Sequence, residues 1–255
     1  MKTFQRWKDA EAQNNTGITD QTLRLVVDQK RQIVLDCREM WPKYASFEED
    51  FALMKDRWKK RYAGKRDVFW DDTNISFNYK PSDADTQRMT YSAYYGENCA
   101  KAGVFVQLCG WGGANHLWAG GTSDTQYLND SGILETQEIF SRNDLVDDGK
   151  GGRTKVPFTN ILDKGYRSTV AAWQAGKQLV SQPDFKRSDR KFRAVETISS
   201  AGIATDRSSN ERQVNRCKMT GEVSRGLQPG RDYTRLDDAW LAFSFQVNFM
   251  FKSVL

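Results

Sequence analysis

Hydrophobic positions in the first 66 residues follow the spacing of α-helices. A first set of apolar residues is spread through the polar sequence of residues 23–35. The helix that it predicts ends before Pro42, because proline cannot continue a helix. Ser46 and Glu49 have the spacing of a capping box, in which each side chain bonds the other residue's backbone N–H. After them, one helix face is predicted from apolar residues every three or four positions: Phe47, Phe51, Met54, Trp58 and Tyr62. Residues 1–66 are therefore predicted to form an N-terminal helical segment.

From residue 67 onward the pattern changes to short β-rich runs separated by turns. Strands are expected at 68–71, 75–79, 90–95, 104–108, 117–120, 156–162 and 178–181, with residues 90–95 and 104–108 forming an antiparallel pair. Residues 147–152 are expected to form a surface loop. Helices are expected in a segment that Asp124 caps and that reaches Phe140, and at 170–173, 188–219 and 236–251. This order predicts an α/β domain over residues 67–255, with a mixed β-sheet covered by helices.

Composition indicates a globular chain without a membrane span. Of 255 residues, 38% are hydrophobic and 28% are charged, so burial can offset the entropy of folding. No apolar run approaches the roughly 18 to 20 residues of a membrane-spanning helix. The four cysteines form no C-x-x-C pair, which argues against a zinc knuckle or a disulfide framework. A reducing, intracellular location is therefore expected.

The single histidine restricts the chemistry. Ser-His-Asp catalysis, Cys-His catalysis and histidine-rich metal sites all need more histidine, or a context that His116 lacks. His116 itself is interpreted as structural. If the chain is an enzyme, carboxylates must carry its chemistry.

The net charge of +5 permits binding to a polyanion without demonstrating it. Basic residues outnumber acidic ones between Lys186 and Arg235. This segment is either a solvated helix face or a surface that binds phosphate, and the sequence alone leaves both open.

Two aspartates follow apolar strand runs. Asp71 comes after residues 68–70, and Asp163 comes after Ile161 and Leu162. A buried strand that ends in a carboxylate fixes that group rigidly, as catalysis by two divalent cations about 3.5 to 4 Å apart requires. The alternative is that each aspartate merely forms a turn.

A third acid lies in a predicted helix. Helical spacing places Glu211 on one face with Arg207, Asn215 and Lys218. Glu211 either forms an exposed intrahelical ion pair or binds metal while neighbouring cations hold nucleic-acid phosphate.

These segments together resemble the Harbinger-like DDE transposases and their DDE superfamily endonuclease domains. Residues 71–75 resemble the family's first-aspartate strand, Asp-x-Thr-x-Ile, and residues 163–166 resemble its Asp-x-Gly-Tyr motif. Residues 207–212, with Lys218 downstream, resemble its Arg-x-x-x-Glu-Arg helix. The resemblance covers residues 67–255, and its specificity lies in the order and spacing of all three motifs.

The resemblance implies an RNase H-like mixed β-sheet flanked by helices, and two Mg²⁺ or Mn²⁺ ions held by Asp71, Asp163 and Glu211. The implied activity is hydrolysis of a DNA phosphodiester, followed by strand transfer, with water and then a DNA 3′-hydroxyl as the attacking groups. An intracellular, nuclear location is implied as well. The residues expected to contact nucleic acid are Lys164, Arg167, Arg207, Arg212 and Lys218.

Two departures from the family pattern keep alternatives open. Asp72 stands where the family often has glycine, so either Asp71 or Asp72 is the ligand, and the motif register favours Asp71. No helix-turn-helix or zinc finger is found, which implies a separate DNA-binding partner protein and allows a homo-oligomer. Two further readings remain: a domesticated copy that binds DNA or protein without cutting, and a basic α/β binding protein whose acids are structural.

Overall fold

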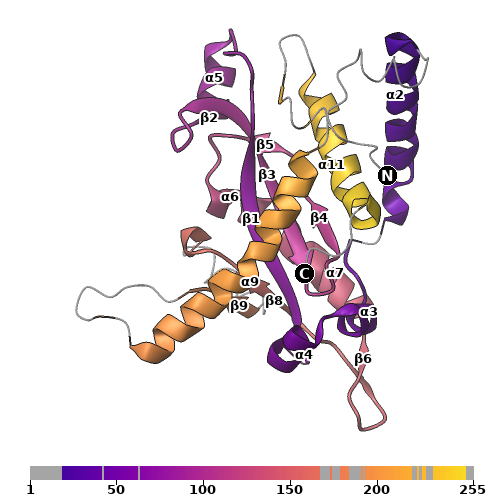
Figure 1. Cartoon of the computed structure of the whole chain (residues 1–255), viewed down its shortest axis with the longest axis vertical. Coiled ribbons are helices and arrows are strands. Elements are labelled where there is room, and N and C mark those ends of the chain that lie inside the picture. The colour runs from indigo at the N-terminus through magenta and orange to yellow at the C-terminus, as the bar shows by residue number, and fades with distance from the viewer. Residues whose placement is uncertain are drawn as a thin grey trace.

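The computed structural model describes residues 19–41, 43–62, 64–166, 173, 179–183, 191, 193–219, 223, 226–227 and 232–250. Within these ranges one curled, mixed β-sheet is covered by helices (Figure 1). This confirms the predicted α/β class and the mixed sheet flanked by helices. None of the helices in these ranges is long and apolar enough to cross a membrane.

The main sheet of the described chain runs in the order β2-β3-β1-β8-β9, and β4 and β5 both pair with β3. Strand β1 is antiparallel to β3 and parallel to β8, and β8 is parallel to β9. The bounds are β1 Arg66–Ser76, β2 Tyr91–Ser92, β3 Glu97–Gln107, β4 Gly112–Ala114, β5 Trp118–Ala119, β8 Phe158–Ile161 and β9 Leu179–Ser181. A separate hairpin pairs β6 (Val146–Asp147) with β7 (Arg153–Thr154).

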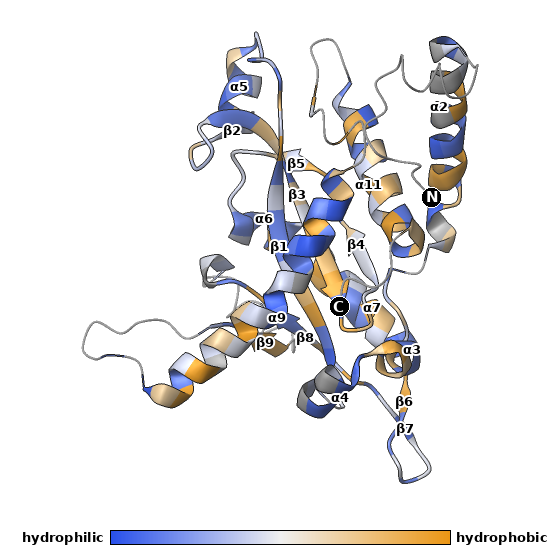
Figure 2. Ribbon diagram, viewed as in Figure 1, coloured by the Kyte–Doolittle hydropathy of each residue, from blue (hydrophilic) through white to orange (hydrophobic). Residues whose placement is uncertain are grey.

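The longest helix, α9, crosses β1 and β3, and α11 packs on β4 beside α2 (Figure 1). Figure 2 shows mainly hydrophilic residues along the half of α9 that lies over the sheet. The helix bounds are α2 Asp20–Asp36, η1 Arg38–Met40, α3 Phe47–Leu53, α4 Asp56–Tyr62, α5 Ala84–Thr90, α6 Asp124–Asp130, α7 Ile133–Asn143, η2 Lys164–Tyr166, α9 Ala194–Lys218 and α11 Tyr233–Met250.

Strand β1 is covered on both faces, and successive side chains point to opposite faces. Phe69 joins a hydrophobic cluster with Ile203 of α9. Its neighbour Trp70 joins a different cluster with Tyr127 of α6 and Ile133 of α7. The run that precedes Asp71 is therefore apolar without alternation, and the two aspartates that follow it face different helices.

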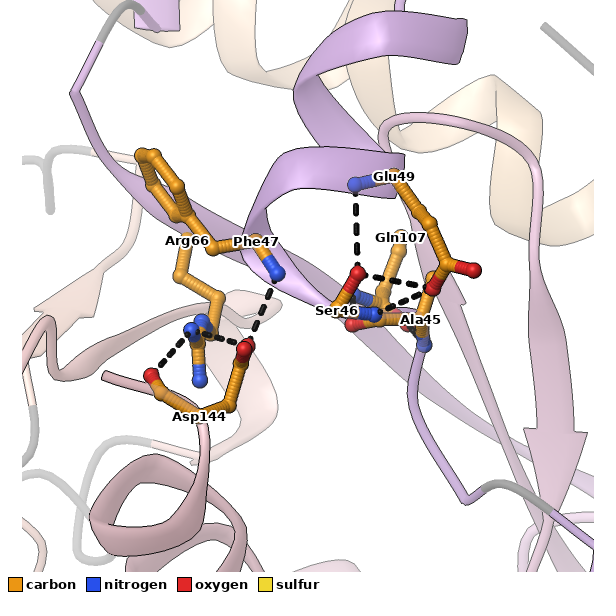
Figure 3. A network of polar contacts seen from close by, with 7 residues as sticks. All are labelled: Ala45, Ser46, Phe47, Glu49, Arg66, Gln107 and Asp144. Atoms are coloured by element: carbon orange, nitrogen blue, oxygen red, sulfur yellow. Dashed lines mark hydrogen bonds and ion pairs between the residues drawn. The ribbon is translucent and has the colours of Figure 1, made fainter. Parts of the chain in front are cut away.

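The predicted capping box is present at the start of α3 (Figure 3). The Ser46 hydroxyl accepts a hydrogen bond from the Glu49 backbone N–H at 3.2 Å, and the Glu49 carboxylate accepts one from the Ser46 N–H at 3.0 Å. The preceding residue is tied to the sheet, because the Gln107 side chain accepts from the Ala45 N–H at 2.7 Å. The helix start is thus fixed both locally and against β3.

A buried arginine joins α3 and α7 at the start of β1 (Figure 3). Arg66 is fully buried and donates to the Asp144 carboxylate at 2.6 Å, and the same carboxylate accepts from the Phe47 N–H at 2.8 Å. The guanidinium also lies over the Phe158 ring, 5.0 Å from its centroid. This contact couples the helical segment to the sheet; the division of the chain at residues 66 and 67 stays a prediction.

Several predicted elements differ from the structure. The aromatic stripe of residues 47–62 belongs to two helices, because Met54 is extended (φ −64°, ψ 137°) and ends α3. Met54 is buried with Trp58 and Tyr62, so the turn places all three in one cluster. Helix α9 begins at Ala194, later than the predicted residue 188. Most of the helix predicted at 170–173 lies outside the described residues; of it, Trp173 is described and buried.

The strand predicted at 90–95 is wrong in most of its length. Asp83 caps α5 by accepting from the Thr86 N–H at 2.6 Å, so the chain is helical up to Thr90. The strand has two residues, and the chain turns at Gly96, whose φ of 71° favours glycine. Local β-propensity is overridden here by a cap and a turn.

Asp124 is not the helix cap that the sequence indicated. The Ser123 hydroxyl accepts from the Gln126 N–H at 3.1 Å and is the N-cap of α6. Asp124 is the first helical residue and forms an ion pair with Lys101. The helix predicted to continue to Phe140 is interrupted at Gly132, where φ is 73°.

Candidate active site where β1, β8 and α9 meet

Backbone register brings Asp71 and Asp163 to the same level. Asp71 is an interior residue of β1, which continues to Ser76 because it pairs with β3 along its length, so the strand end expected at Asp71 is wrong. Asp163 does come after the end of β8. Phe69 of β1 pairs with Ile161 of β8 in parallel, and each aspartate follows two residues later. The chain continues in line past β8, since the Leu162 N–H donates to the Ser181 carbonyl at 3.0 Å. Asp71 and Asp163 therefore lie side by side on neighbouring strands.

Both aspartates contact one arginine of α9. One terminal nitrogen of Arg207 lies 3.0 Å from an Asp163 carboxylate oxygen, and the other lies 3.7 Å from one of Asp71. The Arg207 side chain is 15% exposed, compared with 25% for Asp71 and 47% for Asp163. The two carboxylates thus share one cation in a partly desolvated place.

The position of Arg207 follows from how α9 packs. Ile203, Asn210 and Val214 lie on one face of the helix, at spacings of seven and four residues, and all three are buried. Ile203 and Val214 belong to hydrophobic clusters with β1, and the Asn210 amide donates to the Val104 carbonyl of β3 at 3.4 Å. Arg207 lies between these anchors, over Asp71.

The third predicted acid lies one helical turn after Arg207. The Glu211 side chain is exposed, and its charge is close enough to raise the pKa of Asp71. In the part of the chain that the structure describes, no three His, Cys, Asp or Glu side chains lie close enough together to form a preformed metal site. The structure thus joins Asp71 to Asp163 through Arg207, with Glu211 nearby.

The electrostatics of Asp71 reflect this crowding. Burial raises the pKa of Asp71 to about 6, against the opposing effect of Arg207. The negative charges of Asp163 and Glu211 raise it further. A backbone N–H, that of Asp72, donates to the Asp71 carboxylate at 3.1 Å. The site therefore holds more negative charge than its one bridging arginine balances.

Asp72 lies on the opposite face of β1. Both of its carboxylate oxygens are buried, and neither has a hydrogen-bond partner of ordinary geometry among the described residues. Burial raises its pKa well above the usual range, and the nearby charge of Asp124 adds to this, while Lys101 and the Tyr166 hydroxyl oppose it. Lys101 is itself paired with Asp124.

The predicted nucleic-acid contacts have different surroundings. Arg212 is exposed and donates to the Ser208 hydroxyl at 3.1 Å. Lys218 is partly buried near Glu97 and Cys99, and burial lowers its pKa. The side chain of Lys164 and the whole of Arg167 lie outside the described residues.

Two polar contacts show what the sequence did not reveal. Asp206 is buried and accepts a hydrogen bond from the Tyr62 hydroxyl at 2.5 Å. Lys101 was not singled out, although a lysine within the apolar run of residues 99–106 signals an acidic partner close by. That partner is Asp124.

His116 has the contacts of a structural residue. Its Nδ1 lies 2.6 Å from the Asp237 carboxylate of α11, which also accepts from the Leu117 N–H at 2.7 Å. The hydrogen bond between His116 and Asp237 raises the pKa of His116. A cleft lined in part by His116 and Trp41 includes none of the three predicted acids in its lining.

Comparison with known proteins finds no matching family model, no matching curated protein and no matching solved structure.

Proposed function

We propose that the chain is a DDE-type, metal-dependent endonuclease that hydrolyses DNA phosphodiester bonds, with Asp71, Asp163 and Glu211 as its metal ligands. One observation carries this proposal: aspartates from two parallel neighbouring strands share a single cation, one helical turn from a glutamate. Rigid carboxylates that neighbouring strands hold side by side are what hydrolysis by two metal ions requires.

The sheet topology supports an RNase H-like fold. Antiparallel strands β5, β3 and β1 are followed by the parallel strands β8 and β9. The first acid lies on the central strand and the second follows its parallel neighbour, which is the arrangement that a DDE site needs. We therefore extend the α/β assignment to the RNase H-like class as part of the proposal.

The residues fit a hard divalent cation. Mg²⁺ and Mn²⁺ prefer oxygen ligands from a few carboxylates, with water and phosphate in the remaining positions. Burial, and after it the charges of Asp163 and Glu211, disfavour the ionised form of Asp71, and a bound cation would offset both effects. Asp71 and Asp163 would share the ions, and Glu211 would complete the set from α9. When bound, two such ions activate the attacking water and stabilise the leaving oxygen.

Asp71, rather than Asp72, is the proposed ligand. Asp71 lies with Asp163 on the α9 face, whereas Asp72 lies on the α6 face near the Lys101–Asp124 pair. A ligand must be ionised and must reach the same ion as its partner. Asp72 lies on the opposite face of β1 from Asp163, and burial disfavours its ionised form.

DNA is the proposed substrate, and a nuclear location is part of the same proposal. Arg212 is an exposed cation on the same helix as Glu211, where it can contact a phosphate. Because no DNA-recognition motif was found, we propose that target selection uses a separate DNA-binding protein or a second copy of the chain.

A second candidate function is a domesticated derivative that binds DNA or protein without cutting. The observation that favours it is the ion pairing itself, since Arg207 already offsets part of the charge of Asp71 and Asp163. An active-site arrangement that tolerates the absence of metal can persist without catalysis.

A plasmid-nicking assay with Mg²⁺ or Mn²⁺ tests the proposal. The native chain should nick supercoiled DNA, and Asp163→Asn should reduce the rate by more than about a hundredfold through loss of a metal ligand. The matched control is Asp85→Asn, because Asp85 is an exposed acid on α5 with a surface ion pair. Its rate should equal that of the native chain.

Equal nicking by the native chain and Asp163→Asn would contradict the proposal. If no variant nicks DNA although each one is folded, the non-cutting derivative becomes the better assignment.

A further inference from the structure

Arg207 lies where a cation is needed, but it leaves part of the negative charge unbalanced and one of its own donors unpaired. Its two terminal nitrogens contact Asp163 and Asp71, but its Nε is buried and has no hydrogen-bond partner among the described residues. A single positive charge lies between two carboxylates, and the charge of Glu211 is also close enough to raise the pKa of Asp71. An unpaired buried donor and an excess of negative charge both cost free energy.

The guanidinium and a divalent ion cannot both bind the two aspartates. A magnesium ion would lie about 2.0 to 2.1 Å from each ligand oxygen. Arg207 now contacts one oxygen of Asp163 at 3.0 Å and one of Asp71 at 3.7 Å. An ion shared by these carboxylates would take the space between them and would repel the guanidinium.

The backbone of α9 holds its place while the side chain can move. Ile203 and Val214 are buried on the sheet on either side of Arg207, so the helix is anchored there. An arginine side chain has several rotatable bonds, and its guanidinium matches a phosphate with two parallel hydrogen bonds. Displaced from the aspartates, it remains on the helix face beside the metal-binding oxygens, where the DNA phosphate must lie.

We infer that Arg207 is a reversible substitute for the metal: it bridges Asp71 and Asp163 until a divalent cation displaces it, and the released guanidinium then binds the DNA phosphate. This inference rests on the proposed function and adds a regulation to it. Metal and DNA would bind with positive coupling, so each would raise the affinity of the chain for the other by the same factor. A chain without metal would keep its acids neutralised and its affinity for DNA low.

The first test measures metal binding without DNA. Isothermal titration with Mn²⁺ compares the native chain with Arg207→Gln, which removes the competing charge and keeps hydrogen-bonding groups. We expect the variant to bind Mn²⁺ about tenfold more tightly, within the usual range of a coupling between sites. The matched control is Arg212→Gln on the same helix, whose affinity for Mn²⁺ should change less than about twofold, since Arg212 donates to Ser208.

The second test measures DNA binding with and without a cation. Fluorescence anisotropy of a short labelled duplex is recorded in EDTA and in Ca²⁺, a divalent oxygen-binding ion used here to follow binding. The native chain should bind DNA about tenfold more tightly with Ca²⁺, and Arg207→Gln should lose most of this gain. Arg212→Gln should weaken binding by the same factor in both buffers, because it removes only a phosphate contact.

A measurement on the native chain reports on the guanidinium itself, and a variant serves only to assign its signals. With ¹⁵N-labelled arginine, the terminal N–H protons of Arg207, assigned from the signal lost in Arg207→Lys, should exchange slowly in EDTA. They should exchange faster once Mg²⁺ is added, because the guanidinium leaves its two carboxylates.

The outcomes separate the two proposals. If the native chain binds no Mn²⁺, the proposed function fails and this inference fails with it. If the native chain binds Mn²⁺ but Arg207→Gln has unchanged affinity, or the Arg207 signals do not respond to Mg²⁺, only the inference is overturned.

Discussion

Two neighbouring aspartates on β1 have opposite surroundings. Asp71 faces α9, where Arg207 pairs with both Asp71 and Asp163, and it is 25% exposed. Asp72 faces α6, where both of its oxygens are buried and the nearest cationic group, Lys101, is paired with Asp124. Each has a raised pKa, chiefly because of burial, yet Asp71 alone lies beside an acid from a parallel strand.

These opposite surroundings show what a buried carboxylate needs in order to bind a metal ion. A raised pKa by itself shows only that the ionised form of an acid is disfavoured, and both Asp71 and Asp72 have a raised pKa. A metal ligand also needs a second carboxylate at the same level and a path for a cation. Successive side chains of a strand point to opposite faces, so Asp71 lies on the face of Asp163 and is partly exposed, whereas the adjacent Asp72 lies on the other face.

The largest expected difference between the two faces is in cutting. Asp71→Asn should lower plasmid nicking in Mg²⁺ by more than about a hundredfold, because a metal ligand is lost. Asp72→Asn should stay within about threefold of the native rate, since it replaces a buried acid of raised pKa with a neutral group of similar shape. Equal losses in the two variants would show that the comparison is wrong.

The next effect is on stability without metal. The folded-state pKa of Asp71 is about 6, above the unfolded value of 3.8, so the native chain loses stability as the pH rises from about 4 to 6. Asp71→Asn should therefore be more stable than the native chain by about 1 to 3 kcal/mol at pH 8 in EDTA, and equal to it below pH 4. Urea unfolding at each pH measures this.

Repeating the urea unfolding with Mg²⁺ shows whether metal binding accounts for the difference in stability. Bound metal should stabilise the native chain and remove or reverse the advantage of Asp71→Asn, because a ligand that binds only the folded state adds to its stability. Asp72→Asn should gain the same stabilisation from Mg²⁺ as the native chain. An advantage of Asp71→Asn that is unaffected by Mg²⁺ would argue against metal at this position.

The smallest effect concerns the α6 face. Lys101→Met removes the cation near Asp72, and the partner Asp124 is 46% exposed, so water can partly replace the ion pair. We expect a loss of about 1 to 2 kcal/mol in urea unfolding. Mn²⁺ affinity should be unchanged, and a clear change in it would extend the metal site to this face.

The sequence predicts the positions of the two aspartates better than their contacts. Asp71 and Asp163 both follow apolar runs that are readable in the sequence, but β1 continues to Ser76, so only Asp163 stands after a strand end. The parallel register of β1 and β8 brings the two acids together. Arg207 was expected to contact phosphate or to pair with Glu211, yet it bridges the two aspartates. That contact depends on how α9 crosses the sheet, which is set by distant packing partners of Ile203 and Val214.

Element boundaries were predictable where local signals agree. The capping box at Ser46 was confirmed because both of its residues act within one turn. Residues 90–95 have strong β-propensity, but the cap at Asp83 and the turn at Gly96 leave a strand of two residues. The N-cap was assigned to Asp124 instead of Ser123, because both residue types cap helices and the ion pair with Lys101 is non-local.

The acids on the α9 face are proposed to bind a divalent cation. Titration with Mn²⁺, followed by electron paramagnetic resonance, measures that binding itself. The native chain and Asp72→Asn should bind Mn²⁺ saturably with the same affinity, and Asp163→Asn should lose that binding. Absence of saturable binding by the native chain, or equal binding by Asp163→Asn, would contradict the claim.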